Sequence, residues 1–189
     1  MQSKEDTEDT TTTVKTIGNE MFFYGDITQE SILDFTESFK KLEIDVLKKA
    51  ADMFGYTPSI RVHIMSEGGD LFSGIAAMNV MEKSRVTVIT IAQGACCSAA
   101  TFMLLGGKER RMGPNAQILI HQLATGEFWG NFEELKYEVK SCTKFMKAIK
   151  DIYMKKTKIP ERKFKKLMKK DIYLTASKCL KYKIVHEID

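Results

Sequence analysis

The sequence lacks any apolar run long enough to cross a membrane, so we expect no transmembrane helix and no membrane partner. It also lacks the start of a secretory signal, because residues 1–15 (MQSKEDTEDTTTTVK) carry acids where basic and then apolar side chains would be needed. We therefore expect a cytoplasmic protein that stays where it is made. At 189 residues, with 43% hydrophobic and 29% charged residues, the composition is typical of one soluble globular domain.

Cysteine is scarce and forms no metal-binding motif. Cys96 and Cys97 are adjacent, a spacing at which a disulfide is rare, and Cys142 and Cys179 lie far from both. No CxxC or Cys/His cluster indicates zinc. The cysteines are therefore interpreted as reduced, buried thiols.

Charge is distributed unevenly along the chain. Residues 1–45 carry eleven acids against four lysines, whereas residues 131–183 carry seventeen Lys or Arg against six acids. A basic half of this kind could bind nucleic acid, but its lysines alternate with apolar residues at helical spacing and no binding motif accompanies them. A solvated helix face is the favoured interpretation, and no nucleic-acid partner is expected.

Strands alternating with helices predict one α/β domain with a largely parallel sheet. Residues 1–16, rich in Thr and acids, are predicted to be a flexible arm before a domain over 17–189. Strands are expected at 21–25, 59–65, 86–92 and 116–120. Helices are expected at 28–54, 71–83, after Ser98, at 132–153, from Pro160 and after a Thr175 cap.

Three strand ends carry residues that can do chemistry, and parallel sheets bring such ends to one edge. They are the Gly68–Gly69 turn, the Gly94–Ser98 turn and His121. Ser98 could be a nucleophile near a helix start, although its position alone favours a helix-capping serine. The paired glycines could present a backbone N–H to a substrate carbonyl. The G-x-S-x-G elbow is absent, which disfavours the α/β-hydrolase fold.

His121 ends an apolar strand, where an apolar residue would be easier to bury. A Ser–His pair needs an imidazole that is usually held in one tautomer by a carboxylate. Asp171, in KKDIYLTA, is the candidate for that carboxylate. The residues alone leave Asp26, Asp70 and Asp151 open as alternatives.

The motifs SEGGDLFSG, GACCSAATF, ILIHQ and KDIYLTASKCLKYKIV occur in order, with Ser98 thirty residues after Gly68. Together they resemble the ClpP family of serine peptidases, whose corresponding stretches run S-P-G-G, G-x-A-A-S-x-G/A, M-I-H-Q and D-x-F-L-S-A. The resemblance covers roughly residues 21–187. It implies a spiral of ββα units with a protruding handle at about 122–156. It also implies Ser98 as nucleophile, His121 as general base, Asp171 as orienting carboxylate, and the amides of Gly69 and Ala99 as oxyanion hole.

The resemblance further implies hydrolysis of peptides or unfolded proteins through an acyl-enzyme, with no metal or organic cofactor. Peptide would bind as an added strand. Subunits would form heptameric rings that stack into a tetradecamer around a chamber. The implied peptide-binding residues are Gly68, Asp70, Leu71, Gln122, Leu123, Ala124 and Thr125.

The sequence departs from the family pattern where an AAA+ unfoldase would dock. Family members present apolar and aromatic side chains there, and this chain has a polar, basic set, so an unfoldase partner is possible but the surface is atypical. The set is Arg61, His63, Gln93, Arg111 and Gly113. Glu67 also stands where the family has Pro. Two alternatives remain: an inactive ring or scaffold subunit of the same fold, and a crotonase-like acyl-CoA enzyme, which would not need the three triad residues.

Overall fold

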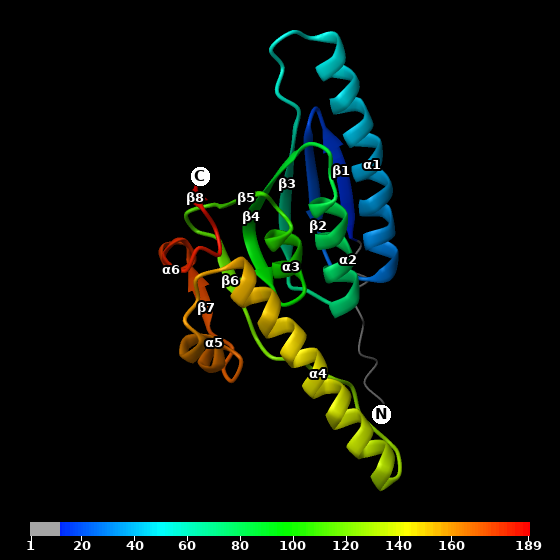
Figure 1. Ribbon diagram of the computed structural model, residues 1–189, viewed down its shortest axis with the longest axis vertical. Helices are drawn as coiled ribbons and strands as arrows, with labels where there is room; N and C mark the ends of the chain where they lie inside the picture. The colour runs from blue at the N-terminus through cyan, green and yellow to red at the C-terminus, as the bar shows by residue number, and fades with distance from the viewer. Residues whose placement is uncertain (1–11) are drawn as a thin grey trace, which may run out of the picture.

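The computed structural model describes residues 12–189, which form a mixed sheet flanked by helices (Figure 1). Six strands run in the order β1-β2-β3-β4-β5-β8, and β6 and β7 extend the sheet from the end of β4. Among the strands of the described residues, only the β1–β2 and β6–β7 pairs are antiparallel. The strands are β1 (Thr13–Ile17), β2 (Glu20–Tyr24), β3 (Ser59–Ser66), β4 (Thr87–Cys97), β5 (Glu109–Met112), β6 (Gln117–Leu119), β7 (Tyr173–Thr175) and β8 (Glu187–Ile188). The predicted α/β domain with a largely parallel sheet is confirmed.

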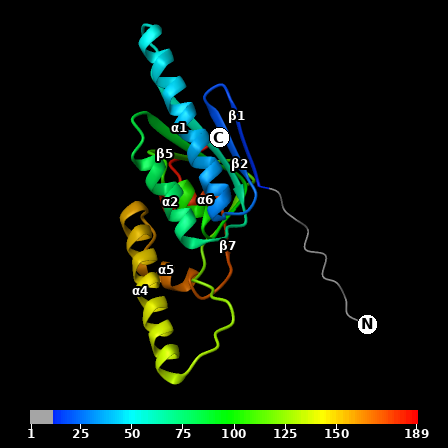
Figure 2. The same ribbon diagram turned by 90° about the vertical axis from the view of Figure 1, so that its right-hand side faces the viewer.

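Helices α1 and α2 lie on one side of the sheet, and α4 extends away from the body (Figures 1 and 2). The helices are α1 (Gln29–Asp52), α2 (Leu71–Glu82), α3 (Ala100–Leu105), α4 (Phe132–Lys156), α5 (Glu161–Leu167) and α6 (Ala176–Lys181). Among the described residues, no helix has the length and apolarity to span a bilayer. The helix expected directly after Ser98 begins two residues later, at Ala100.

Helix α1 has a defined start and a buried apolar face. Thr28 Oγ1 accepts a hydrogen bond from Ser31 N at 3.0 Å, and Ser31 Oγ accepts one from Thr28 N at 2.9 Å. These two bonds give partners to two backbone N–H groups at the start of the helix. Phe35 and Phe39 follow one turn apart, and both are fully buried. The Phe35 ring also packs edge-on against Phe23 of β2. This stack fixes α1 on the sheet.

The predicted flexible arm over residues 1–16 is wrong for its last part. Residues Thr13–Ile17 form β1 and pair with β2 in a continuous antiparallel register. Thr, Val and Ile favour strands, and pairing with an apolar neighbour outweighs the polar composition of this segment. Residues 1–11 lie outside the described part of the chain.

Strand β4 changes partner along its length. Residues Ile89–Ala92 pair with β5, and residues 95–97 pair with β6 after Gly94. At this far end Ser66 of β3, Cys96 of β4 and Ile118 of β6 lie in register across three parallel strands. The residues that follow each strand therefore meet at one edge of the sheet.

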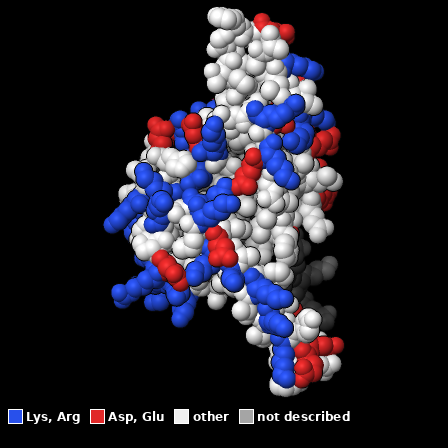
Figure 3. Space-filling model, in the orientation of Figure 1, with Lys and Arg blue, Asp and Glu red and all other residues white. Residues whose placement is uncertain are grey.

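The excess of basic residues in the C-terminal part of the sequence also gathers in one region of the structure (Figure 3). Figure 3 shows Lys and Arg gathered around α5 and α6 and along α4. Helix α5 (ERKFKKL) buries Phe164 and Leu167 and leaves most of its basic side chains in solvent. The expected amphipathic arrangement, with a solvated basic face, is confirmed for this helix.

Candidate active site

A cavity of about 310 Å³ lies at the edge where β3, β4 and β6 end. Both Ser98 and His121 line it, although they are 23 positions apart in the sequence. Gly69 and Ala99 line it as well. The structure therefore brings together four of the five residues that the sequence assigns to catalysis.

Ser98 is held in an unusual backbone conformation. Its φ is 52°, a left-handed value that costs a residue with a Cβ roughly 1–2 kcal/mol. Its N–H donates to Leu119 O at 2.9 Å, and its carbonyl accepts from Thr101 N at 3.0 Å and from Thr101 Oγ1 at 2.6 Å. Thr101 in turn makes a short hydrogen bond with the buried Tyr153 hydroxyl of α4. Strain held in place by fixed neighbours is common at functional sites.

Gly68 and Gly69 are needed because no side chain fits at either position. A Cβ on Gly68 would lie 2.7 Å from Ser98 Cβ, and one on Gly69 would lie 2.2 Å from Ile27 O. Both residues also have positive φ, 111° and 140°. Gly68 N donates to Ser66 Oγ and its carbonyl accepts from Ile27 N, so its polar groups are already engaged. The turn is thus packed against Ser98 through bare backbone.

The two predicted oxyanion donors remain available. Within residues 12–189, neither Gly69 N nor Ala99 N donates a hydrogen bond to another protein group. Ala99 lies at the N-terminal cap of α3, where helix amides have no partner inside the helix. Two cavity-lining amides without acceptors can stabilise negative charge on a bound oxygen.

His121 follows β6 and is half-buried on the cavity wall. In the part of the chain that the structure describes, no hydrogen bond joins its ring to Ser98 or to a carboxylate. Catalytic hydrogen bonds are often long in unliganded structures and tighten with substrate. No group of three or more His, Cys, Asp or Glu is arranged to hold a metal ion in residues 12–189.

Asp171 does not line the cavity and is exposed. It lies just before β7, whose pairing with β6 sets Leu119 opposite Tyr173 and Ile118 opposite Leu174. The same antiparallel register, continued two residues past the strand ends, sets Asp171 opposite His121. The ladder stops short of that point because Ile172 N donates to Lys170 O at 2.9 Å instead of pairing with β6.

The alternative carboxylates have other roles or positions. Asp70 lines the cavity, but its Oδ1 accepts hydrogen bonds from Ser73 N at 2.7 Å and Ser73 Oγ at 2.6 Å, which cap α2. Asp151 is exposed on α4. Neither Asp26 nor Asp151 lines the cavity. Asp171 is favoured because only it has the register that leads to His121.

The predicted peptide-binding residues are placed in two groups. Six line the cavity, and they are Asp70, Leu71, Gln122, Leu123, Ala124 and Thr125. Gly68 does not line it, because it is buried beneath Ser98. Gly68 packs against Ser98, and its contact with a bound peptide stays a prediction.

The sequence profile of the Clp protease family matches residues 21–189. The chain belongs to the Clp protease family. An ATP-dependent Clp protease proteolytic subunit of Deinococcus radiodurans is 32% identical over 131 residues, which are 68% of this chain and 64% of that protein. The aligned segment thus spans less than two thirds of that relative. The chloroplastic subunit 1 of Arabidopsis thaliana is 30% identical over 68% of this chain and 67% of its own length.

A solved structure of a ClpP1 point mutant from Listeria monocytogenes superposes with a TM-score of 0.76. The match covers 91% of each chain at 23% identity. At this identity the likeness shows the fold alone. The predicted ClpP-type α/β fold is confirmed.

One wall of the cavity in this Clp protease family member was missed by motif reasoning. It is a face of α4 with side chains three or four residues apart, formed by Glu138, Cys142, Phe145, Ile149 and Tyr153. Phe72 of α2 and Phe102 of α3 face the same space. The helical spacing on α4 is visible in the sequence, but which of its faces meets Ser98 depends on how α4 packs.

The thiol of Cys97, the residue before Ser98, lies where its surroundings oppose ionisation. Burial raises the pKa of its thiol to about 12, and the nearby Glu67 carboxylate contributes to the increase. The thiol therefore stays protonated at neutral pH, and the thiolate is the reactive form. Cys96 is fully buried, and its pKa is raised by burial as well.

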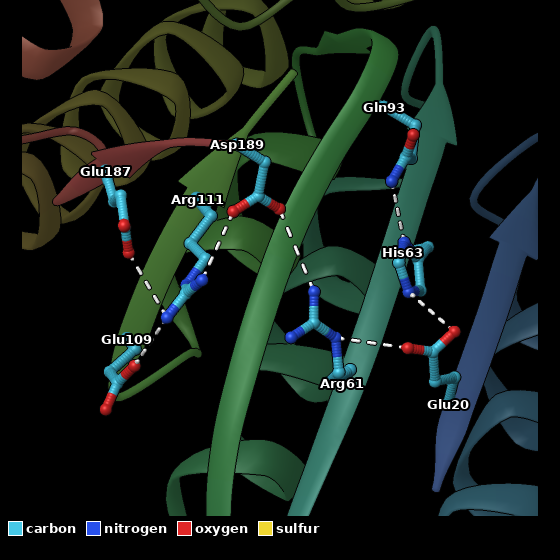
Figure 4. A network of polar contacts seen from close by, with 8 residues as sticks. All are labelled: Glu20, Arg61, His63, Gln93, Glu109, Arg111, Glu187 and Asp189. Carbon is cyan, nitrogen blue, oxygen red and sulfur yellow. Dashed lines mark hydrogen bonds and ion pairs between the residues drawn. The ribbon is translucent and has the colours of Figure 1, made fainter. Parts of the chain in front are cut away.

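The atypical surface residues belong to a network of charged side chains on the sheet (Figure 4). Arg61 contacts Glu20 at 3.2 Å and Asp189 at 3.9 Å. Arg111 contacts three carboxylates at 3.2–3.5 Å, those of Glu109, Glu187 and Asp189. The predicted basic surface is thus paired with acids that the motif comparison had not considered.

His63 and Gln93 complete this network, and Gly113 lies outside it. Gln93 Nε2 lies 2.7 Å from His63 Nδ1, while His63 Nε2 faces Glu20 at 3.5 Å. Burial is the main reason that the pKa of His63 is lowered. Gly113 N donates to Ala92 O at 2.9 Å, beside the end of β5.

Proposed function

We propose that the chain is a serine peptidase that cleaves peptides or unfolded polypeptides, with Ser98, His121 and Asp171 as its catalytic residues. One observation carries the proposal most. Ser98, in a strained conformation, shares a cavity with His121 and with two amides that have no acceptor among residues 12–189. Family membership supports the same activity.

The reaction follows from the roles of these groups. His121 takes the proton of Ser98 Oγ as the oxygen attacks the peptide carbonyl, and the N–H groups of Gly69 and Ala99 stabilise the oxyanion. The C–N bond breaks, the amine leaves with the proton from His121, and an acyl-enzyme remains. Water, deprotonated by His121, then releases the acid and restores Ser98.

Asp171 acts through His121 rather than on the substrate. Its carboxylate would hold the imidazole in one tautomer and stabilise the imidazolium that forms. The β6–β7 register supports this role, since its continuation sets the two residues opposite each other. Closure of this contact requires the chain between Lys170 and Ile172 to straighten.

Peptide would bind as an extended strand between residues 69–71 and residues 122–125. Both segments line the cavity, and residues 121–131 form no helix or strand. An added strand gains main-chain hydrogen bonds, which give affinity with little sequence selectivity.

Assembly into heptameric rings, stacked as a double ring around a chamber, fits the exposed apolar side chains near α4. These are Phe128, Trp129, Phe132, Leu135, Tyr137, Val139 and Phe145. Such a concentration of exposed apolar groups marks an interaction surface. The protruding α4 would join the rings.

An unfoldase partner that inserts an apolar loop is disfavoured by the network of Figure 4. Burying Arg61 and Arg111 under such a loop would desolvate two cations together with their carboxylates. We propose a dedicated partner or none. Cytoplasmic location remains a prediction, and one relative is named as chloroplastic.

Labelling with a fluorophosphonate tests the proposal. Wild type should be labelled at Ser98 and should cleave short fluorogenic peptides, and Ser98→Ala should lose both by several orders of magnitude. Absence of labelling in the folded, assembled wild type would favour an inactive ring subunit. Labelling at another residue would refute the assignment of Ser98.

A further inference from the structure

Helix α4 forms one wall of the active-site cavity. Among the α4 residues that line the cavity, Glu138 is the one with a carboxylate. The other lining residues of α4 are Cys142, Phe145, Ile149 and Tyr153. Glu138 is also less exposed than its neighbours on α4 from Asn131 to Lys140. The wall is therefore apolar except for a carboxylate at its N-terminal end.

This carboxylate has no cationic partner in the described part of the chain. The ion pairs on α4 join Lys136 to Glu133, Lys150 to Glu161, and Lys156 to Glu82. Glu138 Oε1 accepts only a weak hydrogen bond from Cys142 Sγ at 3.6 Å. The other acid on the cavity, Asp70, is occupied in capping α2.

Glu138 lies far from Ser98 along the cavity. The start of α3, just after Ser98, contacts the C-terminal half of α4 through the Phe102 and Tyr153 rings, 5.7 Å apart. Leu123 N lies 3.3 Å from Met146 Sδ, so the segment after His121 runs beside the middle of α4. Glu138 is fifteen residues before Tyr153, about 22 Å along the helix axis at roughly 1.5 Å per residue.

We infer that Glu138 selects substrates with a lysine or arginine five or six residues from the cleaved bond. This inference rests on the proposed function of the cavity. An extended peptide advances about 3.3 Å per residue, so about seven residues span the distance, and a long side chain shortens that by one or two. The methylene stem of such a side chain suits the apolar wall, and its charged end reaches the carboxylate.

A neutral or acidic side chain lacks this match. A bound peptide excludes water from Glu138, which is unfavourable unless the peptide supplies a hydrogen-bond donor or a cation. An acidic side chain would add repulsion between like charges. Substrate choice would therefore be cation-selective at one position and tolerant elsewhere.

Peptide binding to the intact Ser98→Ala protein tests the inference without turnover. Fluorescent decapeptides with a single lysine, norleucine or glutamate at one position are compared by anisotropy. We expect lysine to lower Kd about fivefold relative to norleucine, as a partly solvated pair about 4 Å apart would give. Glutamate should weaken binding, and added salt should reduce the preference for lysine.

Two variants decide whether Glu138 is responsible. Glu138→Gln should bring the ratio of lysine to norleucine affinities close to one. Glu133→Gln removes a carboxylate from the same helix that does not line the cavity, and the ratio should persist. Equal affinities in the parent protein, or a preference that survives Glu138→Gln, would overturn the inference.

Turnover by the protein with Ser98 intact gives a second measurement. The ratio of kcat/KM for the lysine and norleucine peptides should follow the same pattern, and mass spectrometry should find the cleaved bond five or six residues from the lysine. A cleaved bond next to the lysine would contradict the distance argument. Fluorophosphonate labelling separates the two proposals: labelling without lysine preference refutes only the role of Glu138, and lysine preference without labelling refutes only the peptidase.

Discussion

Replacing Gly68 with alanine should destabilise the protein and displace Ser98, against which Gly68 packs. The new Cβ would lie 2.7 Å from Ser98 Cβ and 2.9 Å from Cys97 O, closer than van der Waals contact allows. Overpacking of this kind costs about 1–3 kcal/mol. The φ of 111° adds roughly 1–2 kcal/mol for a residue with a side chain. The expected loss of stability is thus about 2–5 kcal/mol.

Thermal unfolding at one fixed protein concentration measures this effect. For a domain of this size, about 2 kcal/mol lowers Tm by at least roughly 4 °C. Labelling of Ser98 by a fluorophosphonate should fall more than stability does, because the clash displaces Ser98, the proposed nucleophile. Labelling is compared well below the Tm of the variant.

Gly113→Ala is the matched control. A Cβ there would meet its nearest atoms, Gln93 O and Ala92 O, at 3.6 and 3.9 Å, which is ordinary contact. Its effect should stay within about 0.5 kcal/mol. A Gly68→Ala protein with the Tm and the labelling rate of wild type would refute the argument that bare backbone at residue 68 supports Ser98.

Three further predictions concern a carboxylate, a buried acid and assembly. Asp171→Asn should lower kcat strongly with little change in peptide affinity, because a wrong His121 tautomer impairs chemistry; a larger effect of Asp151→Asn would transfer the role. Burial opposes ionisation of Glu43, but hydrogen bonds from Ser84, the Arg85 N–H and Lys40 outweigh it and lower its pKa below 4.5. A carboxyl group whose pKa is lowered by folding stabilises the fold above pH 4.5. The difference in free energy of unfolding between wild type and Glu43→Gln should therefore be largest there and vanish on acidification. A difference that is constant with pH would contradict this. Because α4 is rich in lysine and would face its own copies across two rings, double rings should dissociate at low salt and close as salt rises, measured by sedimentation velocity. A double-ring fraction that is constant or falls with salt would mean that the lysines point away from the partner ring.

Most elements could be predicted because their apolar spacing is local. Helix α1, expected at 28–54, spans Gln29–Asp52, and the strand expected at 59–65 spans Ser59–Ser66. Strand β1 could not be predicted in the same way. Its side chains are mostly polar or exposed, and pairing with β2 is what makes it a strand.

The charged network on the sheet illustrates what strand order adds. Arg61 and Arg111 could be recognised in the sequence because they stand where the family has apolar residues. The carboxylates that pair with them could not be recognised in this way. Glu20 is on β2, and Asp189 follows β8, which pairs with β5 rather than with a sequence neighbour. Partners across a sheet depend on which strands are adjacent, and one short motif does not contain that information.

The sequence places the three motifs of the candidate site together because each follows one of three parallel strands, β3, β4 or β6. Ser66, Cys96 and Ile118 are in register, so the glycine turn, Ser98 and His121 leave the sheet at one level. That level exists because β4 leaves β5 at Gly94 and takes β6 as its new neighbour. Without this change of partner, β6 would have no place beside Cys97, and Ser98 N would lose its hydrogen bond to Leu119 O. The partner change in β4 is therefore the feature of the fold on which the candidate active site depends.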